Sequence, residues 1–582
     1  MNRRPVAAAD PFAVPGALWP RFVLMAVCVV AAAADLAALL ADAVPPSPLM
    51  TSRRCQAMLF AAVRGPDANS RLATFMAYHD ECLIPPNPLP VPPELAVLVV
   101  VGAGCLLLYA LTPYVIILRR GLVRIDRMPE LSRELSRLAR TAGVRVRFLA
   151  DPLNPGIGGL AFGHVGARRV VLNRGLLALA VTDRPAFRAI VLHELAHVRG
   201  GDLDVSYLTV ILWRVFVGVL LLPLLLLFHD KVDGVDRSPL GGAGFWGQLI
   251  ALAAVVLLNH NAVLRERELF ADVRAAHWNG SGKPLLAVLA AAEAARDGGE
   301  RGVSDRQKPW GWTWLRRLLA FHPLPAARRR AIADPAVALA PSVWQCFAVG
   351  LTIGLTWAPV LKKVSLGLAH LGVPPAMRSF TLEAMTALPA AAVPAGAVVA
   401  LGVWRTLLAR YGPRPLLRSQ LFGVAAGAGM TAAGLLTDQD AFLGPYIFRL
   451  PLPTRIAWWG LLTLLSCGCV LWTALAALAW RPALRGSRSA RIVSLLGSSL
   501  GATVFGLVLS WAFSLRVEVD TLGLPPGEFL RRSLHGAAPL LSLFPGRTVT
   551  VTLLALLAAF PLAGLASAAV VRLRGRGGGG AG

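Results

Sequence analysis

The chain has 582 residues, of which 56% are hydrophobic and only 15% are charged, and its mean hydropathy is +0.60. Because soluble domains carry about a quarter charged residues, this composition excludes an ordinary soluble protein and indicates a bilayer protein. The net charge of +26 would suit nucleic acid, but many basic residues concentrate in the short linkers between apolar runs. That distribution is typical of membrane topology, so we expect the lipid bilayer, and not nucleic acid, as a partner.

Apolar runs long enough to cross a hydrocarbon core, which takes roughly 20 helical residues, recur along the whole chain. Every second linker between them is basic, and the positive-inside rule then places both termini on the cytoplasmic side of the cell membrane. We therefore predict a mainly α, polytopic (multi-pass) membrane protein. About ten transmembrane helices are expected, at residues 22–43, 95–118, 205–228, 245–263, 343–361, 384–404, 419–437, 457–480, 493–515 and 549–571.

Three blocks follow from this pattern. Residues 1–118 are expected to form a two-span hairpin around an exported loop at 44–94. Residues 119–340 hold nearly all the polar residues with catalytic potential, interrupted by the spans at 205–228 and 245–263. Residues 341–582 are expected to form a membrane domain of about six helices.

Four residues outside any motif bear on these blocks. Cys55 and Cys82 both fall in the exported loop, where an oxidising compartment permits a disulfide between them. Asp35 and Arg214 lie within predicted spans. Each is interpreted either as an intramembrane functional group or as a structural residue close to the membrane interface.

The middle block has the patterns of a small mixed domain. Residues 128–142 have helical spacing with an outer charged face, and residues 144–148 alternate with the period of a half-buried strand. Glycine-rich residues 156–163 and the apolar run 169–172 predict a hairpin that precedes a helix at 174–180. We therefore expect an α+β domain with a small sheet on the cytoplasmic side.

The segment 191–197 contains the pattern His-Glu-x-x-His, formed by His193, Glu194 and His197. Its surroundings predict a helix, because Asp183 can cap the start and Gly200-Gly201 provides a stop. Residues four apart share a helix face, so both imidazoles can point at one metal ion with Glu194 beside them. Zinc suits this set, since it accepts imidazole nitrogens and one carboxylate and keeps a position open for water. Glu194 would then take a proton as zinc-activated water attacks a carbonyl.

A third ligand is expected from residues 265–272, which continue from the end of the fourth predicted span. Glu268 and Asp272 lie one turn apart on one face, which suits a ligand followed by an acid that orients a ligating histidine. Glu266 is interpreted as a surface charge pointing elsewhere. The alternative for the whole segment is a solvated, charged helix start without a metal.

Residues from about 145 to 330 resemble the HtpX-like and CAAX-prenyl-protease-type membrane metallopeptidases, zinc enzymes of the zincin type. The resemblance rests on several segments taken together: Ala161-Phe162-Gly163, residues 169–172, residues 175–177, residues 193–197, Asp202, residues 267–272, and residues 322–328. One position departs from the pattern. Leu160 stands where the edge strand of the family usually carries an asparagine.

The resemblance also implies roles for several residues that the sequence around them does not indicate. It implies that Glu268 is the glutamate ligand of one zinc ion per chain. It also implies that Asp272 and Asp202 contact the ligating residues and not the metal itself. It also implies that His322 and Arg328 lie near the site and steady the substrate or the developing oxyanion. Without the resemblance, His322 would be interpreted as an ordinary surface histidine.

The predicted function is a membrane-embedded, zinc-dependent endopeptidase that cleaves membrane or juxtamembrane polypeptides. His197 precedes the third predicted span by eight residues and Glu268 follows the fourth by five, so the ion is expected close to the lipid headgroups. Two alternatives stay open: a signalling metallopeptidase resembling the BlaR-type sensors, and a transporter or scaffold with a vestigial metal site. No exported loop here has the size of a BlaR-type sensor domain.

Overall fold

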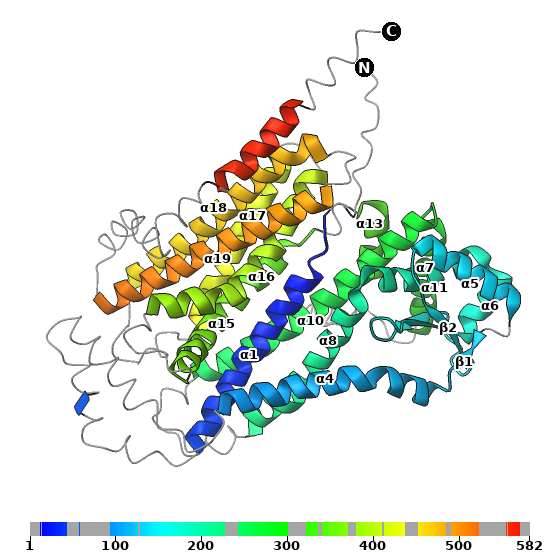
Figure 1. Cartoon of the computed structure of the whole chain (residues 1–582), viewed down its shortest axis with the longest axis horizontal. Helices are drawn as coiled ribbons and strands as arrows, with labels where there is room; N and C mark the ends of the chain where they lie inside the picture. The colour runs from blue at the N-terminus through cyan, green and yellow to red at the C-terminus, as the bar shows by residue number, and fades with distance from the viewer. Residues whose placement is uncertain are drawn as a thin grey trace, which may run out of the picture.

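A computed structural model of the chain shows a mainly helical protein with one small mixed sheet (Figure 1). Cys55, Cys82 and the side chain of Asp35 lie outside the described part of the chain, so the disulfide stays a prediction. The structure describes residues 12, 14–43, 57–58, 93–125, 128–226, 243–300, 322–335, 340–370, 380–409, 413–436, 452–484, 490–522, 555 and 557–570.

Within these ranges, seven helices are long and apolar enough to cross a membrane, and three shorter apolar helices accompany them. All ten coincide with runs predicted from the sequence, although how many cross the bilayer stays a prediction. The long ones cover residues 96–120, 202–226, 249–278, 389–408, 414–436, 456–484 and 490–512, and the shorter ones cover residues 18–33, 343–357 and 557–570.

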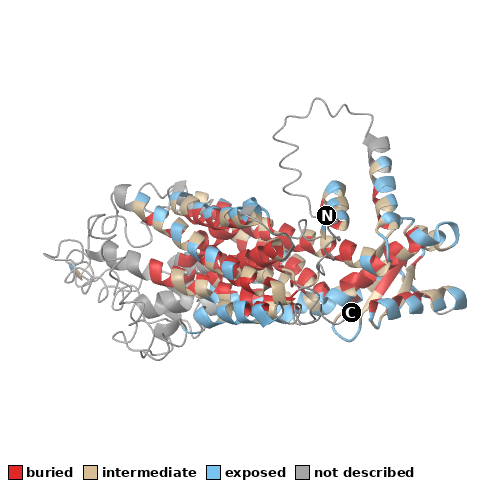
Figure 2. Cartoon of the chain, turned by 90° about the horizontal axis from the view of Figure 1, so that it is seen from above, coloured by how far each residue is buried: buried red, intermediate tan, exposed pale blue. Residues whose placement is uncertain are grey.

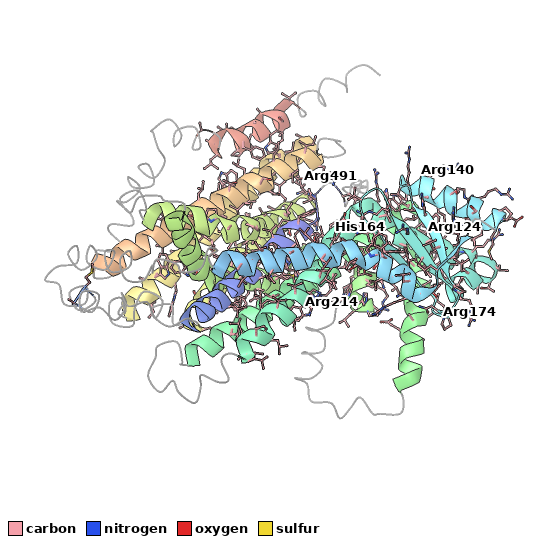
Figure 3. All side chains as sticks on the ribbon, turned by 60° about the horizontal axis from the view of Figure 1, so that its bottom comes forward. Arg124, Arg140, His164, Arg174, Arg214 and Arg491 are labelled. Carbon is pink, nitrogen blue, oxygen red and sulfur yellow. The ribbon has the colours of Figure 1, made fainter. Side chains whose placement is uncertain are left out.

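The first group of apolar helices packs around one buried cluster, which includes Met25, Val101, Phe216 and Val255. The helix α8 (Asp202–Val215) continues into a π-helical turn, and Arg214 near that turn is exposed (Figure 3). The helices of this group are α1 (Leu18–Ala43), α4 (Pro93–Arg120), α8 (Asp202–Val215) with the π-helix Phe216–Leu221, and α10 (Ala243–Trp278).

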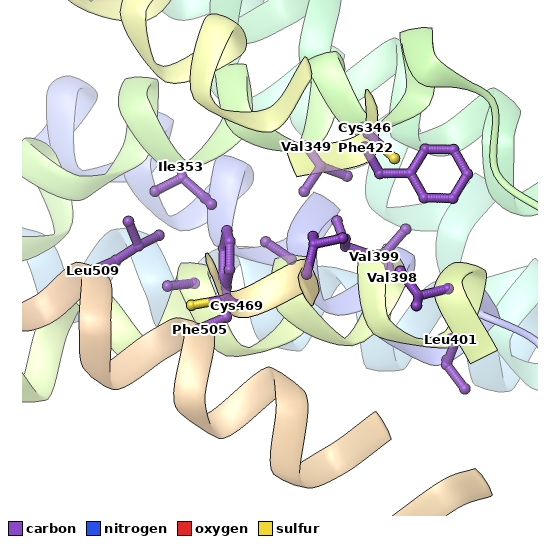
Figure 4. Close-up of a cluster of buried hydrophobic side chains, with 14 of the residues drawn as sticks. Cys346, Val349, Ile353, Val398, Val399, Leu401, Phe422, Cys469, Phe505 and Leu509 are labelled. Carbon is purple, nitrogen blue, oxygen red and sulfur yellow. The ribbon is translucent and has the colours of Figure 1, made fainter. Parts of the chain in front are cut away.

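The C-terminal block is a second helical bundle with its own buried interior (Figure 2). Aliphatic and aromatic side chains such as Ile353, Val398, Phe422 and Phe505 fill that interior (Figure 4). Its helices are α15 (Val343–His370), α16 (Phe380–Ala409), α17 (Pro413–Leu436), α18 (Leu452–Leu484) and α19 (Ala490–Leu522).

Small residues let the helices of this block approach closely. A Cβ on Gly350 of α15 would lie 1.9 Å from the carbonyl oxygen of Ala426 in α17. A Cβ on Gly429 of α17 would lie 2.1 Å from the carbonyl oxygen of Phe347. Such contacts are typical of membrane helices, where close backbone packing replaces the hydrophobic driving force.

The middle block contains a four-stranded sheet of order β1-β2-β4-β3, in which β2 and β4 are parallel and the other pairs antiparallel. The strands are β1 (Val123–Arg124), β2 (Arg147–Asp151), β3 (Gly159–Phe162) and β4 (Arg169–Asn173). The helices around the sheet are α5 (Pro129–Ala142), α6 (Arg174–Thr182), α7 (Arg184–Gly200), α11 (Lys283–Glu300) and α13 (Pro325–Ala333).

The small mixed sheet predicted from the sequence is confirmed, with one shift. The first strand was predicted at 144–148 but β2 begins at Arg147 and ends at Asp151, because its pairing with β4 sets the register from Arg147↔Arg169 onward. The hairpin β3–β4 lies where the glycine-rich segment predicted it, and β3 is an edge strand.

Candidate metal centre

The helix α7 is defined by local signals at both ends. Asp183 precedes it and accepts a hydrogen bond from the Ala186 backbone N–H at 3.1 Å, while Pro185 occupies the first turn. Gly201 adopts the left-handed conformation, with φ of 66°, that ends a helix. His193, Glu194 and His197 therefore lie in the last two turns of a helix with fixed limits, and all three side chains are buried.

Three potential ligand atoms converge between α7 and α10. His193 Nε2 lies 3.6 Å from Glu268 Oε2, and His197 Nε2 lies 3.5 Å from Glu268 Oε1. Ligand atoms of these three residues all lie within 4.8 Å of one another. Tetrahedral zinc with bonds near 2.0 Å places its ligand atoms about 3.3 Å apart, so the three residues fit a zinc ion after small adjustments.

The other nitrogen of each imidazole faces an acid. His193 Nδ1 lies 3.0 Å from Asp272 Oδ1, and His197 Nδ1 lies 3.7 Å from Asp202 Oδ2. Both acids are buried. A carboxylate behind a ligating histidine fixes the tautomer and leaves Nε2 for the metal. The structure thus places Asp272 and Asp202 next to the two imidazoles, and their role in orienting metal ligands stays a prediction.

The electrostatics of the site favour a cation. Burial lowers the pKa of His193, but Asp272 and Glu268 more than offset burial and raise the pKa to about 10. The two carboxylates therefore stabilise a positive charge at His193. The imidazole–carboxylate donor set fits a divalent metal ion.

Glu194 lies beside the ligands and contacts the edge strand. Its Oε2 accepts a hydrogen bond from the Ala161 backbone N–H at 3.0 Å. A Cβ on Gly159 would lie only 2.7 Å from Glu194 Cγ and 3.0 Å from the carbonyl oxygen of Val171. Glycine at 159 therefore permits the close approach of β3 to α7. Leu160, which replaces the family's usual asparagine, lies between these two contacts.

The loop after β3 is tied to the apolar helices. Asp204 at the start of α8 accepts hydrogen bonds from Tyr109 of α4, at 2.6 Å, and from Arg168. Arg168 also donates to the carbonyl of Gly163. His164 Nε2 lies 2.9 Å from the Tyr109 carbonyl oxygen. The edge strand is thus held next to α4 and α8.

Arg328 lies near the centre, as the resemblance implied, and it binds Asp272. Its Nε and Nη2 donate to the two carboxylate oxygens, each at 2.6 Å. Burial lowers the pKa of Arg328, and the Asp272 carboxylate outweighs burial and raises it. Arg328 therefore orients the acid that orients His193, and its contact with an oxyanion stays a prediction.

His322 lies at the solvent side of the centre. Its Nδ1 is 3.8 Å from Glu268 Oε2, and its side chain is 78% exposed. This position leaves the imidazole next to the ligand and accessible to a substrate. Its proposed role in substrate binding stays a prediction.

Two contacts of α10 were not anticipated. Arg267 donates to Glu268 Oε1 at 2.9 Å, so a cation from the same helix helps to fix the carboxylate. Glu266 was predicted to be a surface charge, and that prediction was wrong, because Glu266 is buried and binds Arg21. The partner lies 245 residues away in sequence, and no local signal identifies it.

A buried pair of imidazoles with one carboxylate, and a second glutamate beside them, defines a candidate metallohydrolase centre. Residues 127–336 match the family model of Peptidase family M48, and this segment includes every residue of the centre. The segment is thus similar to metallopeptidases of this family, and the match confirms the resemblance inferred from the sequence. A search of curated proteins and a search of solved structures found no match.

Proposed function

We propose that this chain is a zinc-dependent endopeptidase that cleaves membrane or juxtamembrane polypeptides. The observation that carries the proposal is the convergence of His193, His197 and Glu268, with Glu194 beside them. The family match over the same residues supports peptidase chemistry. One zinc ion per chain is proposed, held by those three ligands.

In the proposed hydrolysis, the residues of the chain have distinct roles. A bound zinc ion would supply a Lewis acid and lower the pKa of a water molecule to about 7. Glu194, fixed by the Ala161 N–H, accepts the proton from water and can pass it to the leaving amine. Asp272 and Asp202 face the Nδ1 atoms of the two imidazoles, where they would accept the Nδ1–H and favour the tautomer that presents Nε2 to the ion.

The edge strand β3 gives a place for the substrate. One edge of β3 pairs with β4, and Glu194 lies at the other edge of β3. An extended peptide can add to such an edge by main-chain hydrogen bonds, which would lay its carbonyl groups along the centre. Substrate binding at β3 is part of the proposal.

The position of the centre favours membrane substrates. The span that contains α8 begins at Asp202, directly after α7 ends at Gly200. In α10, the apolar run at 245–263 ends five residues before Glu268. The site thus lies at the ends of two apolar helices. From the distribution of basic linkers, we propose that this end and both termini face the cytoplasm.

Glu194→Gln tests the proposal directly. The variant should retain zinc but lose hydrolysis of a membrane polypeptide by at least about 1,000-fold, since the proton acceptor is gone. His193→Ala should lose zinc, measured by metal analysis of the purified protein. Equal turnover by the wild-type protein and Glu194→Gln would contradict the enzyme interpretation and favour a vestigial site.

A further inference from the structure

A buried polar cluster lies on the face of α10 away from the candidate metal centre. Glu266 precedes the ligand Glu268 by two residues, which on a helix turns the side chain by about 200°. Phe270 follows Glu266 on the same face. Arg21, Glu266 and Arg405 are only 4%, 8% and 6% exposed, so three charged side chains from distant parts of the chain are buried together.

The N-terminal segment binds Glu266 through both carboxylate oxygens. The Ala17 backbone N–H donates to Oε1 at 2.6 Å, and Arg21 Nε donates to Oε2 at 2.9 Å. Gly16 lies so close that an added Cβ would be 3.3 Å from Glu266 Oε1 and from the Phe270 ring. The segment therefore rests directly on α10, half a turn from the metal ligand.

The C-terminal block holds that segment from the other side. Arg405 of α16 donates from Nη2 to the carbonyl oxygens of Val14 and Pro15, both at 2.9 Å. Its guanidinium also lies 4.9 Å from the centre of the Phe270 ring. Arg21 contacts α15 as well, since its Nη2 lies 3.4 Å from Gln345 Oε1. Helix α1 contacts α10, α15 and α16, as its course between them shows (Figure 1).

The same segment continues along α10 toward α7. Phe12 lies with its ring centre 5.1 Å from the guanidinium carbon of Arg274. Arg274 in turn donates from Nη1 to the carbonyl oxygen of Ala196, at 3.1 Å, within the His-Glu-x-x-His segment. The N-terminal segment is thus linked to both helices that supply the candidate ligands.

We propose that residues 14–21 together with Glu266 and Arg405 form a clamp that fixes α10 so that Glu268 meets the two histidines. The clamp assigns a role to the C-terminal block: it completes the metal centre without contributing a ligand. Glu266, Arg21 and Arg405 are positioning residues. An unpaired buried charge is costly, so breaking one contact of the clamp releases the segment from α10. This inference rests on the proposed metal centre.

The test compares Glu266→Gln and Arg405→Met with Arg418→Met, which removes an exposed arginine of the same block. The metal-free full chain is first examined by hydrogen–deuterium exchange. Glu266→Gln and Arg405→Met should increase exchange severalfold in peptides covering residues 264–278, and Arg418→Met should not. Arg21→Lys keeps a cation beside Glu266, so its exchange in these peptides should be closer to that of the wild-type protein.

Zinc affinity and kinetics then separate positioning from mere stability. Both clamp variants should raise the zinc dissociation constant about tenfold, and lower kcat more than they raise KM. Unchanged zinc affinity with faster exchange would overturn the proposal, as would no change in either. A wild-type protein that binds no zinc would overturn the proposed function itself. If Arg405→Met fails to fold, Glu266→Gln and Arg21→Lys decide the question.

Discussion

His193 Nδ1 lies 3.0 Å from Asp272, whereas His197 Nδ1 lies 3.7 Å from Asp202. The two histidines are thus supported unequally, although both acids are buried. Asp272 is itself held by two hydrogen bonds from Arg328, which makes a chain of contacts from α13 through α10 to α7. The rigidity of the centre therefore depends most on the His193 side.

Asp272→Asn should weaken zinc binding more than Asp202→Asn. An amide cannot replace the carboxylate charge, and loss of such a partner costs about 10–100-fold in metal affinity. Arg328→Met should have a smaller effect than Asp272→Asn, because His193 keeps its acid. Competition with a chromophoric chelator measures all three affinities. Equal affinities for Asp272→Asn and the wild-type protein would show that the acid does not support the metal.

Gly159→Ala should reduce peptide hydrolysis with zinc retained. The added methyl group would lie 2.7 Å from Glu194 Cγ, so either β3 or Glu194 must move. A displacement near 1 Å at a reacting group can cost about 100-fold in rate. The matched control is Gly158→Ala, because the atom nearest its Cβ would be Asn173 Nδ2 at 3.8 Å. Steady-state kinetics should show a lower kcat for Gly159→Ala only; an equal loss in both variants would argue against the close approach.

Gly350→Val should destabilise the C-terminal block. The contact of 1.9 Å with the Ala426 carbonyl oxygen leaves no room for a side chain, and overpacking costs about 1–3 kcal/mol or more. Gly468→Val is the control, since a Cβ there would meet nothing within 4 Å. Thermal unfolding in detergent should show a lower midpoint for Gly350→Val alone. A midpoint equal to that of the control would mean that α15 and α17 do not pack through this glycine.

The sequence was sufficient for features with local causes. A capping aspartate, a proline in the first turn and a terminal glycine define α7, and the spacing of His193 and His197 on that helix places both imidazoles on one face. Ten apolar runs were found because hydropathy depends on composition within a short window. Glu268 could be expected because it shares a helix face with Asp272.

Features set by distant partners could not be predicted from one sequence. The start of β2 depends on its pairing with β4 and shifted by three residues from the predicted strand. Glu266 has the surroundings of an exposed charge, and only the fold brings Arg21 to it. The bond from Arg328 to Asp272 joins two helices that are far apart in sequence, so no local pattern predicted it.

Glu134 provides a pH-dependent contact between α5 and α7. It accepts hydrogen bonds from Arg137, at 2.8 Å, and from Arg188 of α7, at 2.7 Å. Burial raises the pKa of Glu134, but the two arginines outweigh burial and lower it from the ordinary value of 4.5. A lowered carboxylate pKa contributes stability above the unfolded value, and this contribution is lost as the pH falls through the folded value.

Glu134→Gln should therefore lower the unfolding midpoint at pH 7 and have a diminishing effect below pH 4.5. Because both arginines are substantially exposed, the loss at pH 7 should not exceed about 1 kcal/mol. Arg188→Met, which breaks the contact between helices, should cost more than Arg137→Met, which breaks one within α5. Unfolding of the four proteins is followed from pH 7 to pH 3. A difference between Glu134→Gln and the wild-type protein that stays constant over this range would show that the carboxylate charge does not stabilise the contact.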